Sequence, residues 1–180
     1  RCDLAVVLLD ASEGIVEQDT KIIGHVLQGH KGCIILVNKW DLQRDNIKAQ
    51  DKILAGLKRR LAFISFAPLH GISALKGEGL DKIFNLIDEV MEGYTRRVKT
   101  GELNRWFREL LETTPPPSQK GRRIKLNYIT QAAIKPPTFV VFANNPKGVT
   151  ESYKKFLENR LHGDFDLTMT PVRLMFREKS

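Results

Sequence analysis

Four consecutive residues in the first half of the sequence have the types needed to read a purine base. Asn38-Lys39-Trp40-Asp41 directly follows the apolar run Cys33–Val37, which predicts a buried strand. A carboxylate at Asp41 can accept two parallel hydrogen bonds from the N1–H and the exocyclic amino group of guanine. Adenine lacks this donor pair and would leave the carboxylate unpaired, which costs binding free energy. We therefore predict a guanine site in which Asn38 bridges the base edge and loop backbone, and the Lys39 stem lies across the ring or ribose.

A second loop about 30 residues later has a matching chemistry. Ser73-Ala74-Leu75 follows another strand-like segment, Pro68–Ile72. We expect the backbone N–H of Ala74 to donate to guanine O6, and Ser73 to support both the turn and the Asp41 carboxylate. The competing interpretation makes Asn38 and Asp41 turn or capping residues and Ser73 a helix N-cap.

The elements around these loops alternate between strands and helices. Leu4–Leu9 is a continuous apolar run, typical of a parallel strand covered on both faces. Apolar residues at three- and four-residue spacing predict helices around 22–27, 53–61 and 80–91, the last of them including Phe84 on its apolar side. The order βαβαβα predicts an α/β fold with a doubly wound parallel sheet. The carboxyl ends of such strands share one edge, so the two loops are expected to meet there.

The pattern changes near residue 100, and we place a domain boundary between 1–98 and 99–180. The second part reads as helix, strand, strand, helix, strand, which predicts a small α+β domain. Trp106 and Phe107 are interpreted as core residues of the first helix. In the strand that follows, Ile124, Leu126 and Tyr128 alternate with Lys125, Asn127 and Ile129, so Tyr128 is predicted to belong to the buried face.

Composition and charge fit a globular protein with a basic second half. Hydrophobic residues make up 42% and charged residues 28% of the chain, and no apolar run has the length of a membrane span. Residues 1–100 hold 15 Lys and Arg against 13 Asp and Glu, a net +2; residues 101–180 hold 14 against 8, a net +6. Cys2 and Cys33 are expected to be buried reduced thiols of a cytoplasmic protein. The histidines show no ligand spacing, so no metal site is expected among His25, His30, His70 and His162.

The two loops resemble the fourth and fifth signature motifs of translation-factor-type GTPases, and the longer context resembles the Der (EngA) family. The similarity rests on Leu9–Asp19, Thr95–Val98, Gly121–Leu126 and Pro136–Phe139, and it covers the whole chain. The resemblance implies that residues 1–98 are the second half of a P-loop-type GTPase domain and residues 99–180 a KH-like domain. It implies GTP or GDP as ligand, with magnesium in an intact domain, and the large (50S) ribosomal subunit and its RNA as partner.

The phosphate-binding pattern Gly-x-x-x-x-Gly-Lys-Ser/Thr is missing from the sequence. Its nearest approach, Gly24–Lys31, misplaces the lysine and lacks the hydroxyl residue. We therefore expect that the chain is part of a longer GTPase, that no catalytic residue or magnesium ligand lies in it, and that it binds nucleotide weakly. The alternative is a stand-alone nucleic-acid-binding module whose α/β half is degenerate and does not hydrolyse GTP.

KH-type domains usually hold single-stranded RNA through a Gly-x-x-Gly loop, which residues 99–180 lack and which Era GTPases are expected to keep. Basic residues could still meet RNA phosphates, or form a solvated surface on a domain that docks other GTPase domains. These candidates are Arg122, Arg123, Lys125, Lys135, Lys147, Lys154 and Lys155. The strand Leu4–Leu9 is expected to have an open apolar edge, which favours self-association.

Overall fold

A computed structural model describes residues 2–43, 47–119 and 121–178 of the 180-residue chain. The chain forms two compact units. The first unit runs to Glu92 and includes Met169–Pro171, and the second unit comprises Gly93–Thr168 and the residues from Val172 onward. None of the helices in the described ranges is both long and apolar enough to cross a membrane.

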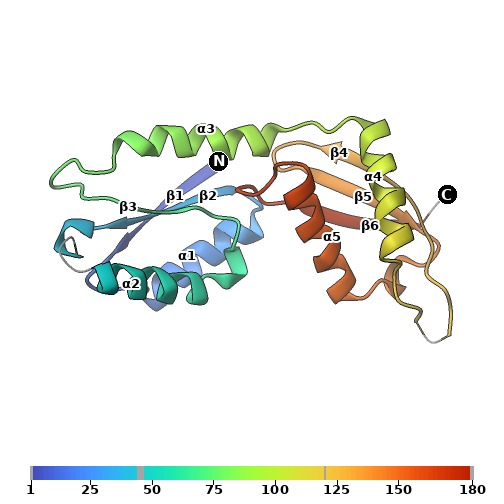
Figure 1. The fold of residues 1–180 in the computed structure, drawn as a ribbon, viewed down its shortest axis with the longest axis horizontal. Helices are drawn as coiled ribbons and strands as arrows, with labels where there is room; N and C mark the ends of the chain where they lie inside the picture. Colours follow the sequence, from blue (N-terminus) through green and yellow to red (C-terminus); the bar gives the residue numbers. More distant parts are fainter. Residues whose placement is uncertain (1, 44–46, 120, 179–180) are drawn as a thin grey trace. The chain divides into compact units, whose positions relative to one another are not determined.

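The first unit is a three-layer α/β structure, which confirms the predicted fold class (Figure 1). Its strands form a parallel sheet in the order β1-β2-β3. The helices α1 and α2 pack on one face of this sheet and α3 on the other. The elements are β1 (Leu4–Asp10), α1 (Glu17–Gln28), β2 (Gly32–Asn38), α2 (Ile47–Arg60), β3 (Leu69–Gly71) and α3 (Asp81–Thr95), with short 3-10 turns at Trp40–Gln43 and Ala62–Ile64.

The central strand β2 is buried along almost its whole length, as its continuous apolar sequence predicts. Alternate residues point to opposite faces. Ile35 and Val37 pack with α1 and α2, and Ile34 and Leu36 pack with α3. A buried hydroxyl joins the α3 side, where Thr170 Oγ1 donates to the Val90 carbonyl at 3.0 Å.

The prediction that β1 is covered on both faces is wrong. Val7 and Leu9 are buried, but Val6 and Leu8 keep 46% and 54% of their surface exposed. These two residues lie on the α3 side of the sheet, yet they are not part of the apolar cluster that α3 makes over β2. The α3 cluster therefore reaches Leu4 at the start of β1 but leaves this face of the strand open at Val6 and Leu8.

The second unit is an α+β structure in the predicted order αββαβ. Its sheet has the order β4-β5-β6, in which β4 is antiparallel and β6 parallel to the central β5. Both helices contribute to one core with the sheet. The elements are α4 (Thr100–Thr113), β4 (Leu126–Ala133), β5 (Thr138–Ala143), a 3-10 turn at Pro146–Gly148, α5 (Glu151–Asp164) and β6 (Arg173–Glu178).

The predicted alternation along β4 is wrong at Tyr128. The β4–β5 pairing is irregular between Leu126 and Tyr128, where a bulge shifts the register. A bulge inserts an extra residue and reverses which positions face the core. As a result Ile129 is buried, with 1% of its surface exposed, and Tyr128 is 38% exposed.

Two further burial predictions need correction. Cys33 is buried, and burial raises the pKa of its thiol to about 11, but Cys2 is exposed. The helix predicted around residues 80–91 is present as α3, but Phe84 is 73% exposed and so lies off the face that packs on the sheet. Trp106 and Phe107 belong to the core as predicted, Phe107 fully and Trp106 at its margin, where Trp106 Nε1 donates to Asp164 at 2.6 Å.

Candidate functional site

The two predicted base-reading loops meet at the carboxyl ends of β2 and β3. Val37 and Gly71 are paired neighbours in the parallel sheet, so the residues that follow them emerge side by side. Backbone hydrogen bonds continue beyond the strands: Ile72 N donates to Val37 O at 2.9 Å, and Trp40 N donates to Ile72 O at 3.0 Å. We call this edge, with Asn38–Asp41 and Ser73–Gly79, the base edge.

Asn38 links the two loops directly. Its side-chain oxygen Oδ1 accepts a hydrogen bond from the backbone N–H of Ala74 at 3.0 Å. The two residues are 36 positions apart in the chain. The backbone donor that the sequence suggested for guanine O6 is therefore in contact with the amide of the other motif.

Asp41 is held as a carboxylate. Its side chain keeps only 9% of its surface exposed, and Lys76 Nζ lies 3.4 Å from Oδ2. A hydrogen bond from the Ser73 hydroxyl, followed by the nearby Lys76 ammonium, lowers the pKa of Asp41 despite partial desolvation. Ser73 itself is buried, and its Oγ also accepts from Lys76 N at 3.2 Å. A pKa lowered in this way favours the ionised form of Asp41.

Lys39 points toward the end of β1. Its Nζ lies 2.6 Å from Asp10 Oδ2, and its backbone has a positive φ of 60°. Hydrogen bonds from Lys39 and Ser12 hold the pKa of Asp10 well below its usual range, and the same pair raises the pKa of Lys39. Asp10 was not among the predicted site residues. The signal that would have found it is its place at the end of an apolar strand that runs parallel to β2.

The Ser73–Gly79 loop folds back on β3. Ser73 N donates to Glu78 O at 3.0 Å, and His70 Nε2 lies 3.0 Å from Gly79 O. Gly79 has a positive φ of 74°, and a Cβ there would lie 2.8 Å from the Gly71 carbonyl oxygen. Glycine is required because both the left-handed backbone and this close approach exclude a side chain. At the tip of the loop Leu75 is 91% exposed.

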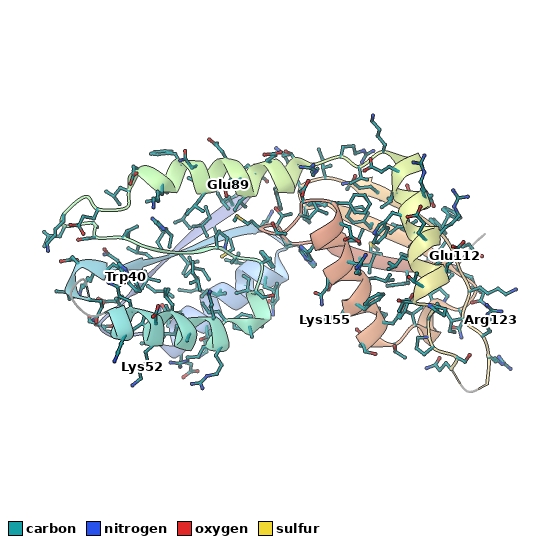
Figure 2. All side chains as sticks on the ribbon, in the orientation of Figure 1. Trp40, Lys52, Glu89, Glu112, Arg123 and Lys155 are labelled. Atoms are coloured by element: carbon teal, nitrogen blue, oxygen red, sulfur yellow. The ribbon has the colours of Figure 1, made fainter. Side chains whose placement is uncertain are left out.

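Trp40 occupies the space that Gly71 leaves open. A Cβ at Gly71 would lie 2.7 Å from the indole ring, so the ring rests against the backbone of β3 (Figure 2). This contact packs Trp40 beside the loop, on the side of the core that contains α1 and α2.

The basic residues predicted for RNA fall into separate groups in the second unit. Asn144 ties down the segment before β4, because Lys125 N donates to its Oδ1 at 2.9 Å and its Nδ2 donates to Arg123 O at 3.2 Å. The 3-10 turn that carries Lys147 packs against the same segment through Gly148 and Ile124. Four of the seven residues therefore gather at this end of the β4–β6 sheet, which we call the basic end: Arg122, Arg123, Lys125 and Lys147 (Arg123 is labelled in Figure 2).

The other three lie elsewhere. Lys135 is in the turn between β4 and β5, at the opposite end of these strands. Lys154 and Lys155 are on α5, where Lys154 pairs with Glu151 at 2.6 Å and lies over the Phe176 ring. Among the residues that the structure describes, no group of three or more His, Cys, Asp or Glu side chains is arranged to hold a metal ion.

Comparison with known proteins gives matches to both units. Residues 1–93 match the family model of the elongation factor Tu GTP binding domain, and residues 97–177 match the KH-domain-like, C-terminal domain of EngA bacterial GTPase enzymes. A solved structure of Aquifex aeolicus Era bound to GDP and AlF4⁻ overlaps with a TM-score of 0.41 at 18% identity, over 98% of this chain and 65% of that chain. An overlap this low carries no argument about function.

Curated relatives match almost the whole chain. The GTPase Der of Moorella thermoacetica is 46% identical over 98% of this chain, that of Natranaerobius thermophilus 41% over 99%, and that of Caldanaerobacter subterraneus 42% over 99%. The chain spans 40%, 41% and 41% of these three relatives. On its sequence similarity to these relatives and its matches to both family models, this chain belongs to the Der (EngA) family of GTPases.

Proposed function

We propose that the first unit carries the guanine-reading half of a Der-type GTP site, with Asp41 as the residue that selects the base. The observation that carries this proposal is the position of the Asp41 carboxylate, only 9% exposed and held by Ser73, whose neighbour Ala74 donates to Asn38. The Ala74 N–H, the Asn38 amide and the Asp41 carboxylate are hydrogen-bonding groups that can complement those on the edge of a purine. They lie at the carboxyl ends of parallel strands, where α/β sheets bind their ligands.

The chemistry at Asp41 distinguishes guanine from other purines. Guanine offers two adjacent donors, N1–H and the exocyclic amino group, to the two oxygens of one carboxylate. Charge-assisted pairs of this kind are among the stronger hydrogen bonds in proteins. Xanthine has a carbonyl oxygen in place of the amino group. This oxygen is a hydrogen-bond acceptor and would face the carboxylate, which is also an acceptor.

The Ala74 N–H has a clear part in this proposal. It donates to Asn38 Oδ1, and guanine O6 is an acceptor of the same kind as that oxygen. On binding, the base carbonyl would share or replace Asn38 as the acceptor, and the Asn38 side chain would then be available to the base edge. Lys39, held by Asp10, would have to release this ion pair to lie across the ring.

The residues present do not supply the groups that phosphate binding and GTP hydrolysis require. Phosphoryl transfer depends on a phosphate cradle and magnesium ligands, and the sequence contains no Gly-x-x-x-x-Gly-Lys-Ser/Thr pattern. We propose that these 180 residues recognise the base without hydrolysing GTP. Their affinity for GDP is accordingly expected to be weak and independent of magnesium, and tight, magnesium-dependent binding in calorimetry would contradict this.

The replacement Asp41→Asn tests the base-reading role. An amide can accept from N1–H and donate to the xanthine carbonyl, so it fits xanthine and no longer fits the amino group of guanine. We expect the affinity for GDP to fall roughly tenfold to a hundredfold, and that for xanthosine diphosphate to rise, from the loss and gain of such hydrogen bonds. The measurement is an NMR titration of the 180-residue chain that follows the Ala74 amide and the Trp40 indole signals.

Asp51→Asn provides the matched control. It removes the same charge from an exposed position on α2 and should leave both affinities unchanged. If Asp41→Asn bound GDP and xanthosine diphosphate as the unmodified chain does, Asp41 would not read the base.

For the second unit we propose RNA of the large ribosomal subunit as partner, the role that the family resemblance implies. Support comes from the net +6 of residues 101–180 and from the four residues of the basic end. Lys and Arg clustered on one side of a small domain are typical of proteins that bind the phosphate backbone of a nucleic acid.

Self-association through β1 is a further expectation for this chain. β1 pairs only with β2 among the described strands, and Val6 and Leu8 are exposed next to its free edge. Unpaired strand edges with apolar side chains pair with other chains. We expect light scattering to show dimers or larger species at high concentration, and Leu8→Lys to return the chain to a monomer. A monomer at all concentrations before any substitution would disprove it.

A further inference from the structure

Among the described residues of the second unit, α4 and α5 both pack on the same face of the β4–β6 sheet and leave its other face to other contacts or to solvent. The helices α4 and α5 lie beside this sheet in Figure 1. Phe139, Val141 and Ala143 of β5 point to the face where these helices pack, and they form one core with helix residues that include Phe107 and Leu157. The alternate residues of each strand point the other way. We call that side the outer sheet face.

One row across the three strands of the outer sheet face combines two aromatic rings with a cation. Tyr128 of β4 is paired with Phe142 of β5, and Phe142 is paired with Arg177 of β6. Tyr128 is 38% exposed, Phe142 is half-buried and Arg177 is exposed, whereas Val140, one row further along β5, is 4% exposed. We call Tyr128, Phe142 and Arg177 the aromatic row.

The two rings of the row are stacked face to face across β4 and β5. Their centroids are 4.3 Å apart and their planes differ by 15°. The bulge in β4 places Tyr128 on this face; with regular alternation it would have pointed into the core. The pair uses one face of each ring, so a flat ligand would extend the stack on the outer face of Tyr128, the ring on the edge strand β4.

The charges around the row favour an anionic partner. The strand positions on the outer sheet face include Arg173 and Arg177 and contain no Asp or Glu within β4, β5 and β6, since Glu178 alternates to the helix-covered side. Arg177 and Arg173 are four residues apart, about 13 Å along β6. Lys125, exposed directly before β4, extends the row into the basic end.

We propose that the aromatic row is a binding site for unpaired bases of single-stranded RNA. A base would extend the stack on the outer face of Tyr128, which Phe142 supports from behind, and Arg177 and Lys125 would bind neighbouring phosphates. This combination of stacking platform and basic flank is how single strands are held without a Gly-x-x-Gly loop. The proposal rests on the RNA partner proposed above for the second unit. It adds Tyr128, Phe142 and Arg177, which were not among the basic residues predicted from the sequence.

The test measures binding of the 180-residue chain to a fluorescein-labelled single-stranded RNA of about 12 nucleotides, a length within the usual site sizes, by fluorescence anisotropy. Tyr128→Leu and Phe142→Leu keep apolar cover on the sheet but remove a ring. Each is expected to weaken binding about tenfold, within the range of stacking contributions to single-strand binding. Tyr128→Phe keeps the ring and should bind as the unmodified chain does. Circular dichroism of each variant confirms that it is folded.

Salt dependence separates stacking from charge. Arg177→Gln should lower the slope of log affinity against log salt concentration by about 0.7, the contribution of one phosphate contact to a single strand. Tyr128→Leu should leave that slope unchanged. The double variant Arg122→Ala/Arg123→Ala should reduce both the affinity and the salt slope. Adding Tyr128→Leu to this double variant should lower the affinity further, by the same factor as in the unmodified chain.

Each contrary result has a distinct meaning. If the unmodified chain binds no RNA at low salt, both the RNA partner and the aromatic row are wrong. If RNA binds and the ring-removing variants bind equally well, the aromatic row is wrong and the RNA partner stands. If these variants change self-association in light scattering and leave RNA affinity intact, the outer sheet face docks protein instead. Equal binding of a duplex, with the same dependence on Tyr128, would also overturn stacking of unpaired bases.

Discussion

Replacing Gly79 by alanine is expected to displace the loop that carries Ser73 and Ala74. Gly79 has a φ of 74°, and an added Cβ would lie 2.8 Å from the carbonyl oxygen of Gly71. An L-residue pays about 1–2 kcal/mol for the left-handed backbone, and overpacking adds about 1–3 kcal/mol. Because the obstacle is backbone in a strand, it cannot rotate away. The loop should therefore move, the Ala74 N–H should leave Asn38, and guanine nucleotide binding should be lost with it.

Gly77→Ala is the matched control for this change. Gly77 has nearly the same φ, 73°, but nothing lies within 4 Å of a Cβ at that position. It therefore reports the cost of the backbone conformation alone, about 1–2 kcal/mol. Thermal unfolding gives the two stabilities, and hydrogen exchange of the Ala74 amide reports the loop. Equal effects of the two substitutions would show that the contact with Gly71 does not constrain the loop.

Replacing Phe107 by alanine is expected to give a large loss of stability in the second unit. Phe107 is 1% exposed in the core that α4 and α5 share with the sheet. Phenylalanine-to-alanine changes at such sites cost about 3–5 kcal/mol through lost burial and the cavity that remains. This is a large part of the 5–15 kcal/mol that stabilises an ordinary domain. Urea unfolding followed by Trp106 fluorescence, in a Trp40→Phe background, measures it.

Phe84→Ala makes the same chemical change on a helix of the first unit. Phe84 is 73% exposed on α3, so its loss should change the free energy of unfolding by no more than about 0.5 kcal/mol. Since Trp106 reports only its own surroundings, circular dichroism is recorded alongside for this variant. A loss at Phe84 comparable to that at Phe107 would mean that Phe84 is covered in solution.

Local patterns in the sequence were sufficient for the order of elements and for the two loops of the base edge. Helical spacing and apolar runs depend only on near neighbours, so α1 to α5 and the six strands follow from them. Asn38 and Ser73 follow strands that are parallel neighbours, and the shared edge of such strands brings their loops together. The contact between Asn38 and Ala74 is thus a consequence of topology that could be anticipated, although base recognition there remains our proposal.

Other parts of the site depended on register, which short patterns do not specify. Lys39 pairs with Asp10 because β1 and β2 align Asp10 with Asn38, and no spacing in the sequence reveals that alignment. Likewise, the sequence of β1 is apolar throughout, and only the position of α3 over β2 determines that Val6 and Leu8 are left exposed.

The second unit gives the clearest example of what the sequence determines and what only the tertiary structure decides. The sequence by itself determined that a strand begins near Leu126 and that basic residues precede it. Only the tertiary structure determined which side of that strand each residue occupies, because one irregular pairing with β5 reverses the alternation between Leu126 and Tyr128. A strand has a side-chain period of two, so a single extra residue moves every later side chain to the other face. That shift placed Ile129 in the core and Tyr128 beside Phe142 on the outer sheet face.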